Sequence, residues 1–280
     1  MRNLKDLWFG VIRHPFRTAA EAFVAFSVLW TLTESFSYFV PGFDLKGRFW
    51  LSVFGFISFC WAVDRAWKPS KVEFKVATCD TIIEIVFGDI FLRDGIRAIP
   101  VSEFFESQLG KPVSDRSLHG IFLKTAFGGQ PESFDKQVDT ELTSVPFVIS
   151  PKSEGKSKSY SIGTTVLIRV NDDRYLLFAL TKTDLQTCKV YSDVSMMWQA
   201  LHCLWQRARI EAGGHPFNVP LVGSGLSGLG LPSRDLVNLI VLSAITETKA
   251  KKITSRIRIV LHRDRFEELD LREVKRHWKE

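Results

Sequence analysis

The sequence predicts an α/β protein in two parts: an N-terminal transmembrane helical hairpin, residues 1–68, and a cytosolic domain, residues 69–280. Average composition is ordinary, at 45% hydrophobic and 24% charged residues, but the distribution is uneven. Apolar and aromatic residues crowd the hairpin region, whereas charged residues dominate afterwards. Beyond the hairpin, segments rich in β-branched residues alternate with segments of helical periodicity. That alternation is typical of a three-layer α/β/α domain with a mixed, mostly parallel sheet.

Two apolar runs, at about 19–40 and 49–67, are predicted to be membrane-spanning helices. Each approaches the ~20 residues that cross a ~30 Å hydrocarbon core. The link between them opens with Pro41 and Gly42, which favour a turn and therefore a tight hairpin. A buried hairpin of a soluble protein is the alternative, but neither run has the polar face that a soluble helix needs. A cleaved signal peptide fits poorly, because a second apolar run follows at once.

Basic residues flank the hairpin on both sides and predict its orientation. They are Arg2, Lys5, Arg13 and Arg17 before the first run, and Arg65, Lys68, Lys71 and Lys75 after the second. The link between the runs has only Lys46 and Arg48. Positive-inside bias places both termini in the cytosol. The net charge of +6 is then better explained by attraction to anionic lipid than by a nucleic-acid partner, which we do not expect.

Glu34 is an ionisable residue within the first apolar run. Such residues are costly in hydrocarbon and often mark a pathway or a helix–helix contact. The alternative, left open here, is that Glu34 reaches the membrane interface or bonds to Thr33 and Ser35. Two helices cannot enclose a pore, so any channel would require several copies of the chain.

The cysteines and histidines predict no metal or redox site. Cys60, Cys79, Cys188 and Cys203 show no C-x-x-C spacing, and we expect buried thiols in a reducing compartment. The six histidines are isolated from one another, which argues against a metal site.

Strands and helices alternate along the cytosolic domain. The predicted strands are Val72–Ala77, Thr81–Phe87, Ile96–Val101, Tyr160–Val170, Tyr175–Lys182, Asn218–Val222 and Arg256–His262. The predicted helices are Ser117–Phe127, Ser133–Leu142, a helix capped by Ser192 or Asp193 that ends near Glu211, Ser233–Thr248 and Phe266–Trp278. A turn at 171–174 is expected to join two of the strands as a hairpin.

A glycine-rich segment, Val222–Gly230, follows a predicted buried strand and precedes a helix. Glycines allow backbone N–H groups to converge on an anion, and the helix beginning near Ser233 would add its positive end. The segment is not a P-loop, since no Gly-Lys-Ser/Thr ends it, and it comes too late in the domain for a Rossmann fingerprint. The alternative is a tight turn without a ligand.

The order of these motifs resembles the macro domain family over most of residues 72–265. The resemblance rests on Gly88-Asp89-Ile90 after a strand and on the late strand with its Gly-Ser-Gly-x-x-Gly loop. It is closer still to the macro domains that follow two transmembrane helices in Thoeris antiphage systems. The matching segments are 99–105, 117–120, 161–164 and 220–225.

The resemblance implies a set of ligand-binding residues. Asp89 would contact an adenine amino group, residues 223–228 would line a diphosphate, and residues 117–120 would form the facing phosphate loop. The full set is Asp89, Ile90, Ser102, Ser117, Leu118, His119, Gly120, Gly223, Ser224, Gly225, Leu226, Ser227 and Gly228.

Two departures argue against catalysis. Catalytic macro domains place an asparagine after the third strand and a Gly-Gly-Gly segment in the facing loop. This chain has Ser102 at the first position and 115–120 at the second. His119 could be considered as a general base, but Asp115 is the one carboxylate near it in sequence that could orient it. We therefore expect no catalytic residue, no metal and no cofactor.

The resemblance implies an antiphage effector at the bacterial inner membrane. Its macro domain would sense a nucleotide second messenger derived from ADP-ribose, with histidine–ADP-ribose as the leading candidate, produced from NAD by a TIR-domain enzyme. Binding would assemble copies of the chain into a homo-oligomer that disrupts or permeabilises the membrane, as in abortive infection. The alternatives are a membrane-tethered ADP-ribosyl hydrolase and a scaffold that reads ADP-ribose.

Overall fold

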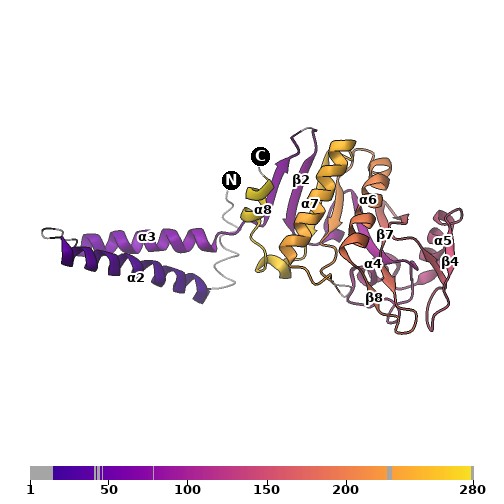
Figure 1. Ribbon diagram of the computed structural model, residues 1–280, viewed down its shortest axis with the longest axis horizontal. Coiled ribbons are helices and arrows are strands. Elements are labelled where there is room, and N and C mark those ends of the chain that lie inside the picture. The colour runs from indigo at the N-terminus through magenta and orange to yellow at the C-terminus, as the bar shows by residue number, and fades with distance from the viewer. Residues whose placement is uncertain are drawn as a thin grey trace. The chain divides into compact units, whose positions relative to one another are not determined.

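The computed structural model describes residues 15–278, apart from residues 41, 43, 44, 46, 78 and 226–228. The chain divides into two compact units (Figure 1). One holds the described residues up to Ser70 together with Asp270–Arg272, and the other holds Lys71–Leu269 and the residues from Glu273 onward.

The first unit is built from two helices, α2 (Pro15–Phe39) and α3 (Arg48–Ala66), which run side by side as an antiparallel hairpin (Figure 1). One face of α3 is buried, and it consists of Phe54, Ser58 and Ala62. Residues four apart lie on the same side of a helix, so this face packs against α2. Two small side chains in that set allow the helices to approach closely.

Large apolar side chains cover the outside of the hairpin. Phe23, Phe36 and Phe59 are 70%, 59% and 63% exposed. Among the described residues, α3 is the one helix whose length and hydropathy suffice to cross a membrane. α2 contains Glu34 and several hydroxyl residues, which lower its hydropathy. By this criterion, one of the two predicted membrane-spanning helices is found, and the predicted transmembrane hairpin is not confirmed.

The second unit contains an eight-stranded mixed sheet. Its path is β1-β2-β10-β9-β3-β7-β6, and β8 pairs with β7. The bounds are β1 Lys71–Lys75, β2 Ile82–Phe87, β3 Ile96–Ser102, β6 Thr165–Val170, β7 Asp173–Thr183, β8 Val190–Tyr191, β9 Phe217–Pro220 and β10 Arg256–Leu261. β2, β10, β9, β3 and β7 are parallel, while β1, β6 and β8 pair antiparallel to their neighbours. The predicted mixed, mostly parallel sheet is confirmed.

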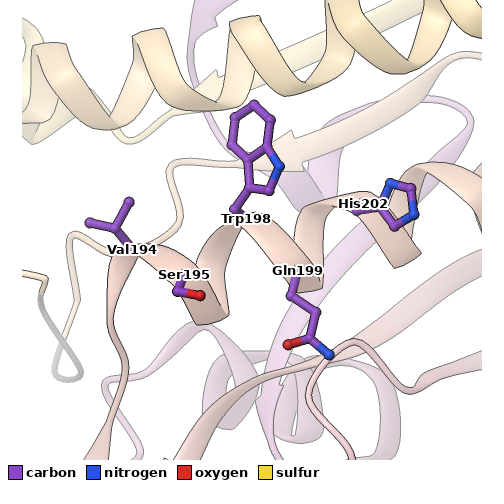
Figure 2. Close-up of a pocket in the computed structure, with 5 residues that line it drawn as sticks. All are labelled: Val194, Ser195, Trp198, Gln199 and His202. Atoms are coloured by element: carbon purple, nitrogen blue, oxygen red, sulfur yellow. The ribbon is translucent and has the colours of Figure 1, made fainter.

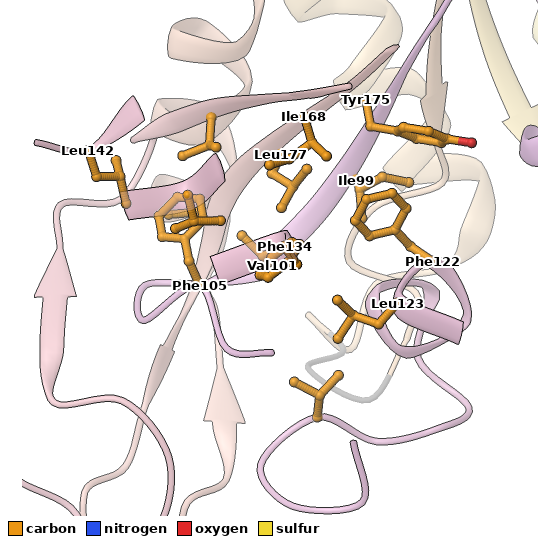
Figure 3. Close-up of a cluster of buried hydrophobic side chains, with 14 of the residues drawn as sticks. Ile99, Val101, Phe105, Phe122, Leu123, Phe134, Leu142, Ile168, Tyr175 and Leu177 are labelled. Carbon is orange, nitrogen blue, oxygen red and sulfur yellow. The ribbon is translucent and has the colours of Figure 1, made fainter. Parts of the chain in front are cut away.

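Helices cover both faces of this sheet. α4 (Leu118–Phe127) and α5 (Pro131–Glu141) lie on one face, where they enclose a core with alternate residues of β3, β6 and β7 (Figure 3). Phe122 is fully buried there, with its ring centroid 4.8 Å from that of Tyr175. α6 (Val194–Glu211) and α7 (Ser233–Ala250) lie on the other face. Trp205 of α6 contacts the Phe217 ring of β9 and donates to the Ser243 hydroxyl of α7 at 3.0 Å.

Side-chain caps fix where two helices begin. Asp193 accepts a hydrogen bond from the Met196 N–H at 2.8 Å, so it is the N-cap of α6. It is one of the two residues, Ser192 and Asp193, that were predicted to cap this helix. Ser117 caps α4 in the same way through the Gly120 N–H. Caps of this kind satisfy N–H groups that the first turn of a helix leaves without partners.

The predicted final helix, Phe266–Trp278, is wrong in its first part. A 3-10 turn, η2 (Arg263–Phe266), comes first, and α8 (Leu271–Trp278) begins five residues later than expected. Asp270 explains the start, because its carboxylate accepts from the Arg272 N–H at 2.9 Å. Phe266 packs instead against Phe87 of β2, with ring centroids 5.1 Å apart.

The predicted strand Tyr160–Val170 is divided in two. β5 (Lys158–Tyr160) pairs with β4 (Phe147–Ile149) in a separate two-stranded sheet that the sequence did not indicate. The break falls at Gly163, which has φ +90°. A Cβ at this glycine would lie 2.6 Å from the Cys203 Sγ, so the chain turns here because a glycine permits a close approach.

The expectation of buried thiols is not met. Cys60 is exposed on α3, and the other three cysteines are half-buried. All four are free thiols.

Replacement of Phe122 by alanine is expected to lower the free energy of unfolding by about 3–5 kcal/mol, because a fully buried ring is lost from the α4–α5 core. Ile210→Ala is the control, because Ile210 is 75% exposed on α6 and should change stability by less than about 0.5 kcal/mol. Urea unfolding followed by near-ultraviolet circular dichroism measures both. Equal effects of the two substitutions would contradict this description of the core.

Candidate functional site

The sequence-predicted site residues come from segments that follow parallel strands. Gly88 and Asp89 follow β2, Ser102 ends β3, and Leu221–Ser224 follow β9. The carboxyl ends of parallel strands meet at one edge of a sheet, which is where α/β proteins bind ligands. The start of α4 reaches the same edge, since Leu118 packs on a cluster formed by Val86, Ile90 and Val260.

Asp89 caps a short 3-10 helix, η1 (Ile90–Leu92). Its Oδ1 accepts from the Phe91 N–H at 2.9 Å, and its side chain is exposed. Among the described residues, no group bonds to the second carboxylate oxygen. Ile90 points the other way into the protein and is 5% exposed. The local fold therefore presents one acidic oxygen at the strand edge.

The segment that contains Asp89 is anchored at both ends. At its start, the Gly88 N–H donates to the Leu261 carbonyl at 2.8 Å. At its end, the Asn218 Nδ2 and the Arg258 Nη1 donate to the Asp94 carbonyl at 2.7 and 3.4 Å. The Arg258 guanidinium also donates to the Asp94 carboxylate at 2.5 Å, which lowers the pKa of that carboxyl. These bonds hold the Asp89 turn in place.

The glycine-rich segment begins with a closed turn. Gly223 has φ +81°, and its carbonyl accepts from the Leu229 N–H at 3.0 Å. A Cβ at Gly223 would lie 2.7 Å from the Leu229 Cδ1, so only glycine fits here. The Ser224 hydroxyl donates to the Leu221 carbonyl at 3.0 Å. The predicted residues Leu226, Ser227 and Gly228 lie outside the described residues.

A charged cluster from η2 supports this turn. The Arg265 Nη2 donates to the Ser224 carbonyl at 3.2 Å, and its Nη1 pairs with Glu268 at 2.8 Å. Glu268 also accepts from the Ser233 hydroxyl at 2.7 Å. That hydrogen bond, together with the Arg265 charge, holds the pKa of the Glu268 carboxyl below its usual value.

Glu268 changes one expectation about the site. The positive end of the helix beginning near Ser233 was expected to face a ligand anion. The protein's own carboxylate instead bonds to Ser233, the first residue of α7. The N-terminus of α7 thus already interacts with the Glu268 carboxylate. A negative charge is favourable there because the helix dipole is positive at its N-terminus. The expected role of this helix end in anion binding is therefore not supported.

The start of α4 presents backbone N–H groups. The Ser117 hydroxyl donates to the Ser114 carbonyl at 2.7 Å and accepts from the Gly120 N–H at 3.0 Å. The N–H groups of Leu118 and His119 have no hydrogen-bond partner among the described residues, as first-turn N–H groups commonly lack one. Gly120 is required for packing, because a Cβ would lie 2.2 Å from the Ser114 carbonyl oxygen.

The His119 side chain lies in the core rather than at the surface. It is 6% exposed, and its ring centroid lies 6.0 Å from that of Phe134. Burial lowers the pKa of the His119 imidazole to about 3, and the nearby Lys156 charge acts in the same direction. The imidazole is therefore neutral near pH 7, and its Nε2 is buried without a partner among the described residues. The Ser102 Oγ is also buried without a hydrogen-bond partner among the described residues.

A concave surface lies on α6. This hollow of about 650 Å³ is open and shallow, and Figure 2 shows its lining along one face of the helix: Val194, Ser195, Trp198, Gln199 and His202. None of the sequence-predicted site residues contributes to it. The His202 Nδ1 contacts the Glu247 carboxylate of α7 at 2.5 Å, which ties the two helices together. In the part of the chain described, no group of three or more potential metal ligands occurs.

This architecture defines a macro-type α/β domain. A macrodomain of Oceanobacillus iheyensis with MES bound matches with a TM-score of 0.52 at 10% identity, over 74% of this chain and 96% of that chain. The same macrodomain with ADP matches with a TM-score of 0.51 at 11% identity, over 74% and 96%. A glycine-to-valine variant of it with ADPR matches with a TM-score of 0.52 at 12% identity, over 75% and 100%. At these identities the likeness shows the fold alone.

The family can be stated more closely from the sequence. The family described as Thoeris protein ThsA, Macro domain, matches residues 83–262. The chain therefore belongs to the ThsA macro domain family, and the expected macro-like fold is confirmed. No curated protein matches the chain.

Acid should destabilise the protein through His119. Its pKa is about 3 in the folded chain and about 6.5 for an ordinary histidine, so the unfolded chain binds more protons as the pH falls below 6.5. The free energy of unfolding should fall by about 2 kcal/mol from this group between pH 7 and pH 5. In His119→Gln that decrease should be absent, whereas His215→Gln, at an exposed position, should keep it. Urea unfolding at both pH values tests this, and an unchanged pH dependence in His119→Gln would contradict it.

Proposed function

We propose that the chain is a membrane-bound effector of a Thoeris antiphage system, whose macro domain senses a nucleotide derived from ADP-ribose. One observation supports it most. The chain is a member of the ThsA macro domain family, and three of its segments lie at the carboxyl edge of the parallel strands. The Asp89 turn follows β2, the Gly223 turn follows β9, and the start of α4 packs at the same edge. The similar macrodomain structures from Oceanobacillus iheyensis include complexes with ADP and with ADPR.

We assign a part to each segment. Asp89 offers an exposed carboxylate oxygen that can accept from an adenine amino group. The backbone N–H groups at the Gly223 turn, with those of Leu118 and His119, are donors for a diphosphate. The ligand class is thus an adenine nucleotide with a diphosphate, and histidine–ADP-ribose is the particular signal we favour. A TIR-domain enzyme that consumes NAD would supply it.

We also propose that the domain binds this ligand without turning it over. A general base works best when its pKa lies near the operating pH. The pKa of His119, about 3, is far below neutrality, and its ring is enclosed by core residues. The Ser102 hydroxyl has no base bonded to it among the described residues. A membrane-tethered ADP-ribosyl hydrolase remains the enzyme alternative, and its test is product release.

The hairpin of α2 and α3 supplies the membrane part of the proposal. Its exposed phenylalanines and Trp30, 49% exposed, leave a broad apolar surface that water solvates poorly. Insertion in the inner membrane would cover that surface, and the flanking basic residues favour both termini in the cytosol. Ligand binding would then favour an assembled state of the chain that permeabilises or disrupts the bilayer, which requires tighter binding to that state.

Asp89→Ala is expected to weaken the binding of ADP-ribose about 10- to 150-fold, because a hydrogen bond to a charged group contributes about 1.5–3 kcal/mol. Asp172→Ala is the matched control, since Asp172 is an exposed carboxylate in the turn between β6 and β7, at the opposite ends of the strands. Isothermal titration of the purified full chain with ADP-ribose and with histidine–ADP-ribose measures both. Absence of heat with either ligand in the unsubstituted chain would refute the proposed function. Release of free ADP-ribose from a conjugate would favour the hydrolase.

Exchange of residues 1–68 for an unrelated membrane anchor should abolish protection against phage while ligand affinity is retained. An effector needs its own hairpin, whereas a scaffold that only localises ADP-ribosylated partners needs any anchor. Plaque counts on cells that carry the complete defence system measure protection, and titration of the exchanged chain measures affinity. Full protection by the exchanged chain would support the scaffold instead.

A further inference from the structure

One face of α2 contains five polar side chains of the apolar hairpin. At 3.6 residues per turn these positions fall on one side of the helix. The set, named here the polar face, is Ser27, Thr31, Glu34, Ser35 and Tyr38. All of these except Ser27 are exposed, and Tyr38 is 84% exposed.

The polar face points away from α3. Six of the seven half-buried positions between residues 22 and 38 share one side and identify the side that meets α3; they are Ala22, Ala25, Phe26, Leu29, Thr33 and Ser37, and the seventh is Ser27. At about 100° per residue, the middle of that set lies on the opposite side of the helix from Thr31. α3 of the same chain therefore cannot supply hydrogen bonds to the polar face.

Glu34 is the group on this face that most needs a partner. The Thr31 and Ser35 hydroxyls donate to the carbonyls four residues earlier, both at 2.8 Å. The Glu34 carboxyl forms no hydrogen bond or ion pair with any other described residue. Hydrocarbon offers such a group no partner, and an ionisable residue within a membrane helix faces protein or water almost without exception.

We infer that the polar face of α2 is the contact surface for a second copy of the chain. This inference rests on the proposed membrane role of the hairpin. The face is self-complementary, because each copy brings an acceptor at Glu34 and a donor at Tyr38, one turn apart. A symmetric contact uses the same patch on both subunits and satisfies both sets at once. Hydrogen bonds between polar side chains are a common means of holding membrane helices together.

The two sides of α2 thus have different uses. The side towards α3 closes the hairpin, and the polar face joins one hairpin to the next. In the assembled state Glu34 lies between copies rather than against lipid. Contact with lipid or with an unrelated protein are the competing outcomes, and neighbouring positions on α2 distinguish them.

Paired cysteine substitutions test this contact in the full chain. All four native cysteines are first replaced by serine, and a single cysteine is introduced at Thr31 or at Leu32, or in a second pair at Ser35 or at Phe36. The members of each pair are adjacent, exposed and at nearly the same depth, but only Thr31 and Ser35 belong to the polar face. In oxidised membranes, Thr31→Cys and Ser35→Cys should form several-fold more disulfide-linked dimer than their neighbours.

Glu34 itself provides a second measurement. With cysteine at position 31, Glu34→Leu should reduce the disulfide-linked dimer several-fold, whereas Glu34→Gln should retain most of it because an amide still forms hydrogen bonds. Equal cross-linking within both cysteine pairs, or cross-links to a protein of another mass, would overturn the inference. Extraction of the membranes with alkaline carbonate separates two failures. A chain released by carbonate refutes the proposed membrane role and this contact with it, whereas a retained chain without pair differences refutes the contact alone.

Discussion

A row of polar side chains across the sheet constrains how its strands can pair. In register from strand to strand, the row consists of Glu73, Glu84, Arg258, Asn218, Arg97 and Tyr175. Glu84, Arg97 and Asn218 are almost fully buried, at 3%, 5% and 0% exposure. A buried charge is tolerated only with a partner. Glu84 accepts from Arg256 at 2.5 Å, and Arg97 pairs with Asp173 at 2.7 Å. A shift of one residue in any strand would turn these groups to the other face and leave them unpaired.

The same register brings the candidate site together. When β2, β10, β9 and β3 are aligned in parallel, Gly88 and Asp89 after β2 and residues 221–224 after β9 emerge at one edge although they are far apart in sequence. Two members of the row also hold the connection that follows Asp89. Arg258 and Asn218 both donate to the Asp94 carbonyl, where this connection returns to the start of β3.

Local patterns predicted most of this fold, while long-range contacts decided where the prediction differed. Runs of β-branched residues identified β2, β3 and β10, and the periodicity of α6 and α7 was readable because one side of each helix is buried. The Gly223 turn was identified from its glycines, and its φ of +81° explains why. Three features depend on residues distant in sequence and gave no local signal. They are the pairing of β4 with β5, the approach of Gly163 to Cys203, and Glu268 at the start of α7.

His119 shows the same limit for the site. An imidazole in a loop near a candidate ligand suggested a base, because histidine titrates near neutrality in water. Burial against Phe134 lowers its pKa to about 3, and sequence spacing contains no information about that enclosure. The backbone N–H groups of the same segment are present whatever the side chain does, because a helix start presents them. Their use for a phosphate stays a prediction.

Hydropathy and geometry give different information about the hairpin. Hydropathy treats Glu34 and the hydroxyls of α2 as a deficit, and on that measure α3 alone among the described helices is apolar enough to cross a membrane. Five polar residues of α2 lie on the side opposite to α3, whereas Thr33 and Ser37 lie on the side towards it. A helix that meets lipid on its flanks, α3 on one side and another copy on the other does not need to be apolar all round. Under the proposed contact between copies, the low hydropathy of α2 would follow from the polar side chains that this contact requires.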